Sequence, residues 1–150
     1  MALTNSQKLE KPQNHFNVRH SGQAAAGTYK AGELVRVGGD DGYIKPVSAS
    51  TVAGTVGVGI VATDQTVVTT GDYLVYHTGL YFLSGSGFTQ KDINKPFWCS
   101  DSSLGVFQAQ GTNRIPMGRF RGTAATLLGS NNGIFEIGGV VSGTLATTIY

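Results

Sequence analysis

One stretch constrains the fold of this chain more than any other: residues 54–83, with the sequence GTVGVGIVATDQTVVTTGDYLVYHTGLYFL. Its only charged residues are Asp64 and Asp72, and Val, Thr, Gly, Tyr and Leu dominate the rest. β-Branched and aromatic residues fit a pleated, half-buried surface, so the stretch predicts strands. Turn signals divide it at residues 64–65, 71–72 and 77–79. We therefore expect a meander of strands, each about six residues long, at the centre of an all-β core.

Two glycines stand inside the first strand of this meander. In the sequence VGVGI of residues 56–60, alternation places Val and Ile on one face and Gly57 and Gly59 on the other. A bare glycine face weakens a strand unless something else packs closely against it. We therefore expect another backbone to approach this face.

Charged side chains are sparse along the chain. Asp, Glu, Lys and Arg make up 13% of the residues, about half of the usual ~25%. The formal net charge of +2 is not a nucleic-acid signature, so no direct nucleic-acid partner is expected. A sparsely charged surface near neutrality tends to associate. The 150 residues suit a single domain, which we expect to be a subunit of a permanent homo-oligomer.

The chain shows no sign of secretion or membrane insertion. Residues 1–13 lack the apolar run and the small-residue cleavage site of a secretory signal. Apolar runs are interrupted well before ~18 residues, which predicts no transmembrane helix. The single cysteine, Cys99, excludes an internal disulfide framework, and beside Trp98 it is expected to be a small core residue. We expect synthesis in the cytoplasm and no membrane partner.

Residues 1–22 are polar, aperiodic and poor in apolar side chains. They predict an extended N-terminal arm, with Phe16 and Val18 as its contact residues. Two readings stay open: a disordered terminus, and an arm that is ordered only on a partner.

Residues 139–150 form an uncharged C-terminal strand or tail that follows the domain of residues 23–138. An uncharged strand with open edges is prone to aggregate, so this segment must pair within the core or against a neighbouring subunit. Its candidate contact residues are Val140, Val141, Ile149 and Tyr150.

Turn residues also punctuate the rest of the chain. Turns are expected at residues 31–32 and 40–42, and a helical turn near residues 89–93. An Asn132-Gly133 pair is a strong signal for a type I′ hairpin, because both central residues of that turn need positive φ. Further strands are expected at residues 34–37, 43–44, 97–99, 104–109, 115–121, 126–128 and 134–137.

The densest basic spot lies in the strand of residues 115–121. Alternation places Arg119 and Arg121 on one face and Phe120 on the other, with Arg114 nearby. This spot is either a solvated strand face or a contact for an acidic partner surface. Pro116 lacks an amide proton, so it must stand at a sheet edge or at the start of its strand.

The sequence carries no pattern that predicts catalysis or a cofactor. No nucleophile elbow, zinc-protease motif or phosphate-binding loop is present. His15, His20 and His77 are scattered without zinc-ligand spacing. Asp40 and Asp41 could ligate calcium, but no periodic acidic loop follows them, so a turn is the better interpretation. We expect no enzyme, no cofactor and no metal site.

Four segments of the chain form a recognisable set: residues 30–38 (KAGELVRVG), 79–83 (GLYFL), 90–98 (QKDINKPFW) and 115–120 (IPMGRF). Together they resemble the capsid cement, or decoration, proteins of tailed bacteriophages. The chain departs from that family's pattern at Asn94-Lys95, where the family usually has Gly-Asp. The resemblance implies a small antiparallel β-barrel or jelly-roll-like sandwich that oligomerises, often as a trimer. It also implies location in the virion, on the outer capsid surface, where the protein binds the major capsid protein and stabilises the shell.

Another class of function stays open at this point. A carbohydrate-binding or receptor-binding module of the virion would present exposed aromatic rings, because sugars stack on them; a minor structural protein of the tail is a further possibility. The candidate rings are Tyr73, Tyr76, Tyr81 and Trp98.

Overall fold

The computed structural model describes residues 3, 5–6, 17–38, 40–48, 55–84, 88–100, 114–123 and 132–138. These residues form an all-β fold, as predicted, with one turn of 3-10 helix, η1 (Gln90–Asp92). None of the helical structure in these ranges is long and apolar enough to span a membrane. The strands are β1 (Val18–Gln23), β2 (Gly27–Tyr29), β3 (Leu34–Val37), β4 (Ile44–Pro46), β5 (Val56–Ile60), β6 (Gln65–Val67), β7 (Tyr73–Ser84), β8 (Pro96–Cys99), β9 (Ile115–Thr123) and β10 (Asn132–Ile137).

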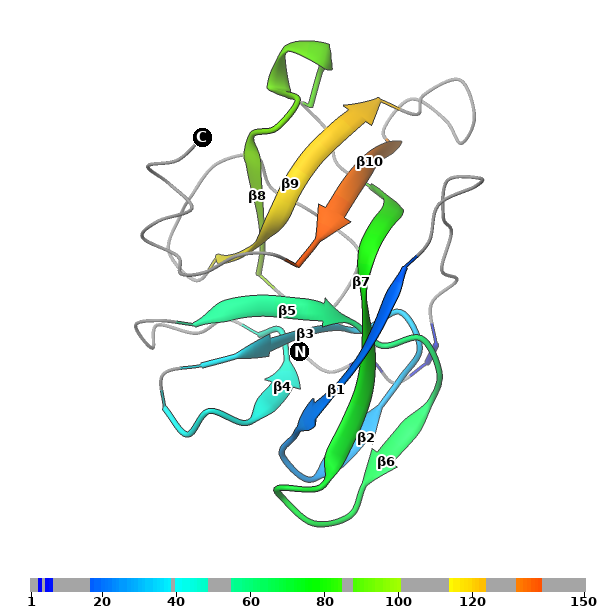
Figure 1. Ribbon diagram of the computed structural model, residues 1–150, viewed down its shortest axis with the longest axis vertical. Helices are drawn as coiled ribbons and strands as arrows, with labels where there is room; N and C mark the ends of the chain where they lie inside the picture. The colour runs from blue at the N-terminus through cyan, green and yellow to red at the C-terminus, as the bar shows by residue number, and fades with distance from the viewer. Residues whose placement is uncertain are drawn as a thin grey trace.

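The sheet is antiparallel and open. Its strand order is β4-β3-β5-β7-β10-β9-β8, with β1 also paired to β7, and β2 and β6 form a separate ribbon. Figure 1 shows β8, β9 and β10 together at one end of the molecule and β3 and β5 crossing its middle. Because the described sheet ends on β4 and β8, it is a small sandwich and not a closed barrel.

Strand β7 connects the two ends of the molecule (Figure 1). Its first half pairs with β1, from Gln23 opposite Tyr73 to Val18 opposite Thr78. Its second half, residues 79–84, pairs with β10. Gly79 has a φ of +139° where β7 changes partner. The turn predicted at residues 77–79 is therefore wrong: the glycine adjusts the backbone inside a strand of 12 residues, twice the length expected.

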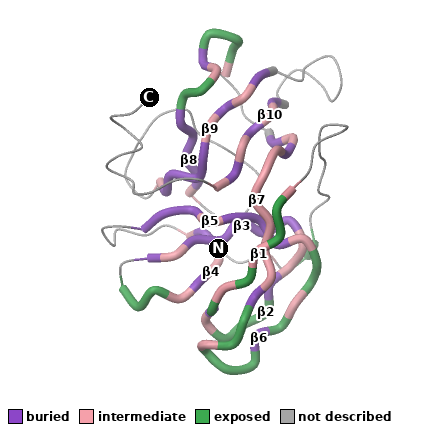
Figure 2. Tube along the Cα trace, viewed as in Figure 1, coloured by how far each residue is buried: buried purple, intermediate pink, exposed green. Residues whose placement is uncertain are grey.

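The first core lies between β3 and β5 on one side and the sheet of β7, β10, β9 and β8 on the other. It is rich in aromatic side chains, and Phe88 and Ile93 pack against its margin. Figure 2 shows β8, β9 and β5 largely buried. Its fully or almost fully buried members are Leu34, Val47, Ile60, Tyr81, Leu83, Phe97, Cys99, Ile115, Met117, Phe120, Phe135 and Ile137. The prediction that Cys99 is a core residue is confirmed.

The second core is smaller and lies on the opposite face of β3 and β5. Neighbouring residues of the chain divide between the cores: Leu34 belongs to the first and Val35 to the second, as Ile60 and Val61 do. Strands β3 and β5 are thus buried on both faces, which explains their nearly continuous apolar sequence. The other members of the second core are Ala24, Tyr29, Ile44, Val67 and Leu74.

Strand β5 contains a β-bulge that the alternation pattern did not predict. Arg36 is opposite Gly57 and Val35 is opposite Gly59, so Val58 is the additional residue. The two glycines therefore do not share a neighbourhood: a Cβ on Gly57 would meet Met117, and one on Gly59 would meet Tyr76. Backbone also crowds both positions, as expected. A Cβ on Gly57 would lie 3.0 Å from the Pro116 carbonyl oxygen, and a Cβ on Gly59 would lie 2.6 Å from the His77 carbonyl oxygen.

The hairpin predicted at Asn132-Gly133 is also wrong. Both residues lie in β10, where Gly133 is opposite Leu83 of β7 and Thr123 of β9. Neither has positive φ. A Cβ on Gly133 would lie 2.8 Å from the Phe120 ring and 3.0 Å from the Phe135 ring. Glycine is needed here to make room for aromatic packing, and not to turn the chain.

Most other local predictions are confirmed. The chain turns at residues 31–32 and 40–42, with positive φ at Gly32 and Gly42. Pro116 is the second residue of β9, at the start of the strand as expected. η1 falls within the predicted helical turn, and β3, β8, β9 and β10 overlap predicted strands. β4 (Ile44–Pro46) shares only Ile44 with the strand predicted at residues 43–44. The strands predicted at residues 104–109 and 126–128 lie outside the described residues.

The predicted boundary between arm and domain falls inside a strand. Residues 18–22, assigned to the arm, form most of β1 and pair with β7, because a polar strand can still join a sheet through its backbone. Farther along the arm, the Leu3 amide donates to Glu33 Oε2 at 2.6 Å and the Ser6 hydroxyl donates to Asp64 Oδ1 at 2.6 Å. The predicted tail, residues 139–150, lies outside the described residues.

Candidate functional site

The structure separates the predicted contact residues that it describes. Val18 is exposed at the start of β1, whereas Arg114 precedes β9 and Arg119 and Arg121 lie within it. In the sheet, β1 and β9 are kept apart by β7 and β10. The remaining predicted contacts lie outside the described residues: Phe16, Val140, Val141, Ile149 and Tyr150.

Within the basic spot, Arg121 binds a carboxylate of its own chain. Its Nε and Nη2 donate to Glu136 Oε1 at 2.7 and 2.6 Å, and its Nη1 donates to Asn94 Oδ1. Arg121 is the additional residue of a bulge in β9, and Arg119 stands opposite Glu136 in the β9–β10 register. Glu136 was not predicted as a site residue, although strand alternation separates it from the apolar face of Phe135 and Ile137. A partly exposed ion pair contributes only ~0–1 kcal/mol, so its main effect is to orient Arg121.

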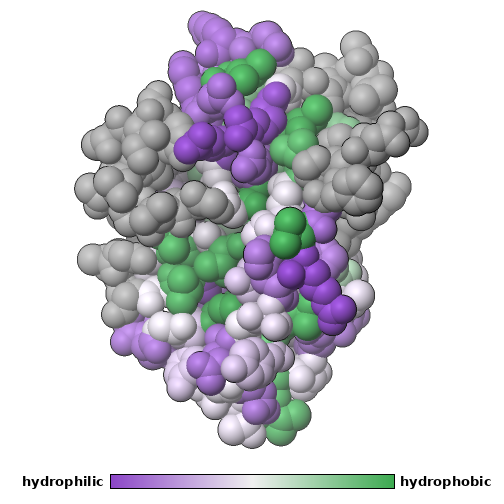
Figure 3. Space-filling view, viewed as in Figure 1, coloured by the Kyte–Doolittle hydropathy of each residue, from purple (hydrophilic) through white to green (hydrophobic). Residues whose placement is uncertain are grey.

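The loop that carries η1 is tied to the same strand. The Asn94 amide donates to the Phe120 carbonyl at 2.8 Å, and the Phe120 amide donates to the Lys95 carbonyl at 2.9 Å. Asn94 has a φ of +70°, a conformation that glycine favours and Asn tolerates. Figure 3 shows mostly hydrophilic residues at this end of the molecule, with a hydrophobic patch among them. The loop and Arg121 thus form one polar edge beside the first core.

Asp92 holds the start of this helical turn. Its Oδ2 accepts hydrogen bonds from the Thr89 amide at 2.8 Å and the Thr89 hydroxyl at 3.1 Å, and its Oδ1 lies 3.2 Å from Lys95 Nζ. The Thr89 amide, followed by Lys95 and the Thr89 hydroxyl, holds the pKa of Asp92 below its usual value. This carboxylate has a structural role as a capping group.

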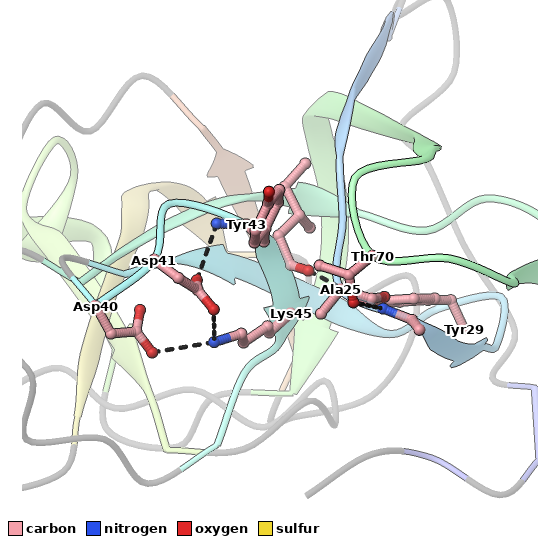
Figure 4. A network of polar contacts seen from close by, with 9 residues as sticks. Ala25, Tyr29, Asp40, Asp41, Tyr43, Lys45 and Thr70 are labelled. Atoms are coloured by element: carbon pink, nitrogen blue, oxygen red, sulfur yellow. Dashed lines mark hydrogen bonds and ion pairs between the residues drawn. The ribbon is translucent and has the colours of Figure 1, made fainter.

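Lys45 forms ion pairs with Asp40 and Asp41, the two aspartates considered above as calcium ligands. Lys45 Nζ lies 3.0 Å from Asp40 Oδ2 and 2.8 Å from Asp41 Oδ2, as Figure 4 shows. Hydrogen bonds from Lys45 lower the pKa of both aspartates, and those bonds raise the pKa of Lys45. Asp41 also accepts from the Tyr43 amide at 3.0 Å. In the described parts of the chain, no three His, Cys, Asp or Glu residues are grouped to hold a metal ion.

Tyr29 fixes the segment that leads into β2 (Figure 4). Its hydroxyl lies 2.7 Å from the Ala25 carbonyl and 3.0 Å from the Ile44 carbonyl, and it can donate to one of them at a time. Burial, with a smaller effect from the Glu33 carboxylate, raises the pKa of Tyr29 to about 12, so the hydroxyl keeps its proton. Thr70 Oγ1 accepts from the Ala26 amide at 3.0 Å and holds the same segment from the other side.

The aromatic residues considered for sugar stacking divide between surface and core. Tyr81 and Trp98 are buried, Tyr76 is half-buried, and Tyr73 is exposed. Tyr76 also stacks on His20, with ring centroids 5.3 Å apart. The set therefore does not form one exposed aromatic face.

A comparison with protein-family models finds no match to this chain, and no curated protein matches it.

Proposed function

We propose that this protein is a capsid decoration protein of a tailed bacteriophage. It binds the outer surface of the shell built by the major capsid protein, and it acts as a homo-oligomer, most simply a trimer. Its role is structural, without catalysis or a cofactor.

The observation that carries the proposal is the convergence of the four segments that resemble this family. They are far apart in the sequence, yet they contribute β3, the second half of β7, η1 with β8, and β9. Each places side chains in the first core, including Leu34, Tyr81, Phe97 and Phe120. Their meeting in one core is what a resemblance at the level of the fold requires.

The departure at Asn94 supports the same interpretation. The family usually has glycine at this position, and Asn94 adopts the positive φ of +70° that glycine would adopt without strain. Asn is among the few other residues that take this conformation readily. The substitution is therefore compatible with a position that is usually glycine in that family.

Decoration stabilises a shell by mass action and needs no chemistry. A ligand that binds only the assembled state stabilises it by RT ln(1 + [L]/Kd), about 2.7 kcal/mol per site at a hundredfold excess over Kd. With few charges on the chain, apolar contacts must supply most of the affinity. Binding should therefore survive about 1 M salt, where the Debye length is only ~3 Å.

The test is addition of the purified protein to shells assembled from the major capsid protein alone. We expect saturable, stoichiometric binding in a sedimentation assay at both low and 1 M salt. Phe16→Ala should weaken binding more than the double change Arg119→Ala and Arg121→Ala, and Lys91→Ala on exposed η1 is the control. Failure to bind, or release by moderate salt alone, would contradict the proposal.

The oligomer is tested separately by multi-angle light scattering on the free protein. A discrete species at micromolar concentration, most simply a trimer, is expected from the sparse charge. A clean monomer would count against the assembly that we propose.

A further inference from the structure

The start of the chain lies against one end of the β3–β5 pair. Leu34 and Ile60 are opposite each other at this end of the ladder. Beyond them, the Val61 amide donates to the Glu33 carbonyl at 2.9 Å, and the Gly32 amide donates to the Val61 carbonyl at 2.7 Å. Leu34 and Ile60 belong to the first core and Val61 to the second. Whatever binds at this end therefore lies beside both cores.

Two residues near the start of the chain bind carboxylates at this end. The Leu3 amide donates to Glu33 Oε2 at 2.6 Å, and the Ser6 hydroxyl donates to Asp64 Oδ1 at 2.6 Å. Asp64 Oδ1 also accepts from the Ala31 amide at 2.9 Å. The Ala31 amide, followed by the Ser6 hydroxyl, holds the pKa of Asp64 below its usual value. This carboxylate is therefore a charged acceptor at neutral pH.

Glu33 is the unusual member of the group, because it is fully buried. A buried carboxylate is costly unless hydrogen-bond donors reach it. The Lys30 amide lies 3.4 Å from its Oε1, which is longer than usual for such a bond. The Leu3 amide, at 2.6 Å from Oε2, is the closer of these two donors. Because a charged acceptor strengthens a hydrogen bond, the contact with Leu3 should hold the start of the chain firmly.

We propose that Leu3, Asn5 and Ser6 form a strap that closes over the end of the β3–β5 pair of their own subunit, with Glu33 as its main anchor. Residues 7–16 connect this strap to Asn17, the residue before β1. A connection of this length gives an effective concentration on the order of mM, about a thousandfold above that of a second copy at micromolar concentration. The strap should therefore bind its own subunit.

The strap differs from both interpretations of the N-terminal arm that the sequence left open, a disordered terminus and an arm ordered only on a partner. In the free subunit, the arm is held on its own domain at two places, by the strap and by β1. A partner that takes up Leu3 or Ser6 has to compete for them with Glu33 and Asp64. This inference does not depend on the capsid function proposed above.

Hydrogen exchange of the Leu3 amide, followed by NMR on the ¹⁵N-labelled full chain, tests the anchor. The amide should exchange at least tenfold more slowly than in a synthetic peptide of residues 1–8. Glu33→Gln should accelerate its exchange about tenfold, because the charged acceptor is lost. Asp41→Asn removes a carboxylate that binds Lys45 instead, and it should leave the exchange unchanged.

A chemical cross-link tests whether the strap binds its own subunit. Ser6→Cys combined with Asp64→Cys places two thiols where the two side-chain oxygens are 2.6 Å apart, and dibromobimane bridges neighbouring thiols. Cys99 is buried and stays in place, with the wild type as the control for its reactivity. We expect a bridged product with the mass of one chain.

Three results would overturn the inference. These are exchange of the Leu3 amide at the rate of the peptide, unchanged exchange in Glu33→Gln, and a bridged product that joins two chains. If Glu33→Gln fails to fold, Leu3→Pro removes the same hydrogen bond from the side of the strap. The cross-link should then form more slowly than with Leu3→Ala, which keeps the amide, and equal rates would also overturn the inference.

Discussion

The two cores of this molecule are stabilised in different ways. In the first, the rings of Phe88, Phe97, Phe120 and Phe135 pack with centroids 4.9–5.2 Å apart, in tilted and edge-on arrangements. Such ring pairs add to the free energy of area burial. The strands around this core include the long β7 and the nine-residue β9. The first core is thus held mainly by side-chain packing.

The second core depends more on polar contacts. Strands β2, β4 and β6 have only three residues each, too few for strong ladders of their own. Gln65 compensates: its Nε2 donates to the Val75 carbonyl at 2.8 Å, and its Oε1 accepts from the Val75 amide at 2.9 Å. One side chain thereby acts as a strand partner for β7. Figure 2 shows exposed positions along β1 and β2, where half or more of the residues are exposed.

The difference shows that one sheet can contribute side chains to two cores that stabilise the fold to different extents. Strands β3 and β5 carry side chains of both cores, and β7 runs through both halves. We therefore expect one cooperative unfolding transition, with the larger share of its free energy coming from the first core.

The largest expected effect comes from removing an aromatic ring from the first core. Phe135 is fully buried and contacts three other rings, so Phe135→Ala should lower the free energy of unfolding by about 3–5 kcal/mol. Leu74→Ala in the second core should cost about 2–3 kcal/mol. Urea unfolding followed by circular dichroism measures both. If Leu74→Ala costs as much as Phe135→Ala, or if two transitions separate, the comparison fails.

A smaller effect is expected where the backbones of β5 and β7 meet. Gly59→Ala would place a Cβ 2.5 Å from the Tyr76 ring and 2.6 Å from the His77 carbonyl. Overpacking of this kind should cost about 1–3 kcal/mol in the same urea assay. Ser21→Ala on exposed β1 is the control and should change stability by less than about 0.5 kcal/mol. If Gly59→Ala has the same urea midpoint as the wild type, β5 and β7 can move apart at no cost in stability.

The contribution of Gln65 to the second core can be measured by substitution. Gln65→Leu leaves the Val75 amide and carbonyl without their side-chain partner and should cost about 1–2 kcal/mol. Gln65→Glu keeps an acceptor for the amide and should cost less. Hydrogen exchange at Val75 should accelerate in Gln65→Leu while exchange at Phe135 stays slow. Equal acceleration at both sites would show that the second core has no separate local stability.

The smallest effect concerns acid stability at the edge of the first core. The pKa of Asp92 is lowered in the folded state from its usual value of 3.8. Its contribution is therefore present above about pH 4 and is lost as the pH falls through the folded pKa. Asp92→Asn should flatten the dependence of the melting temperature on pH below about pH 4. Lys91→Gln on the same turn should leave the profile unchanged. If the melting temperature of Asp92→Asn depends on pH as that of the wild type does, other carboxylates cause the acid sensitivity.

Features that depend on local chemistry could be predicted from the sequence. Turns at residues 31–32 and 40–42 follow from residues that favour turns or positive φ, and β8 and β9 follow from short apolar runs. The burial of Cys99 follows from its apolar neighbours. In the candidate site, the shared face of Arg119 and Arg121 was predicted, but the carboxylate that binds Arg121 was not. Glu136 is 15 residues away in the sequence, and only the β9–β10 register brings it there.

By itself, the sequence determined that this chain forms β-strands around an apolar interior, because residue type and alternation act over a few neighbouring positions. The tertiary structure decided what each glycine is for. Gly79 lets β7 change partner, Gly59 admits the β7 backbone, and Gly133 makes room for two phenylalanine rings. Glycine serves turns and close approaches equally well, and only the contacts brought by distant segments distinguish the two. The same long-range register decided that Arg121 has an acidic partner.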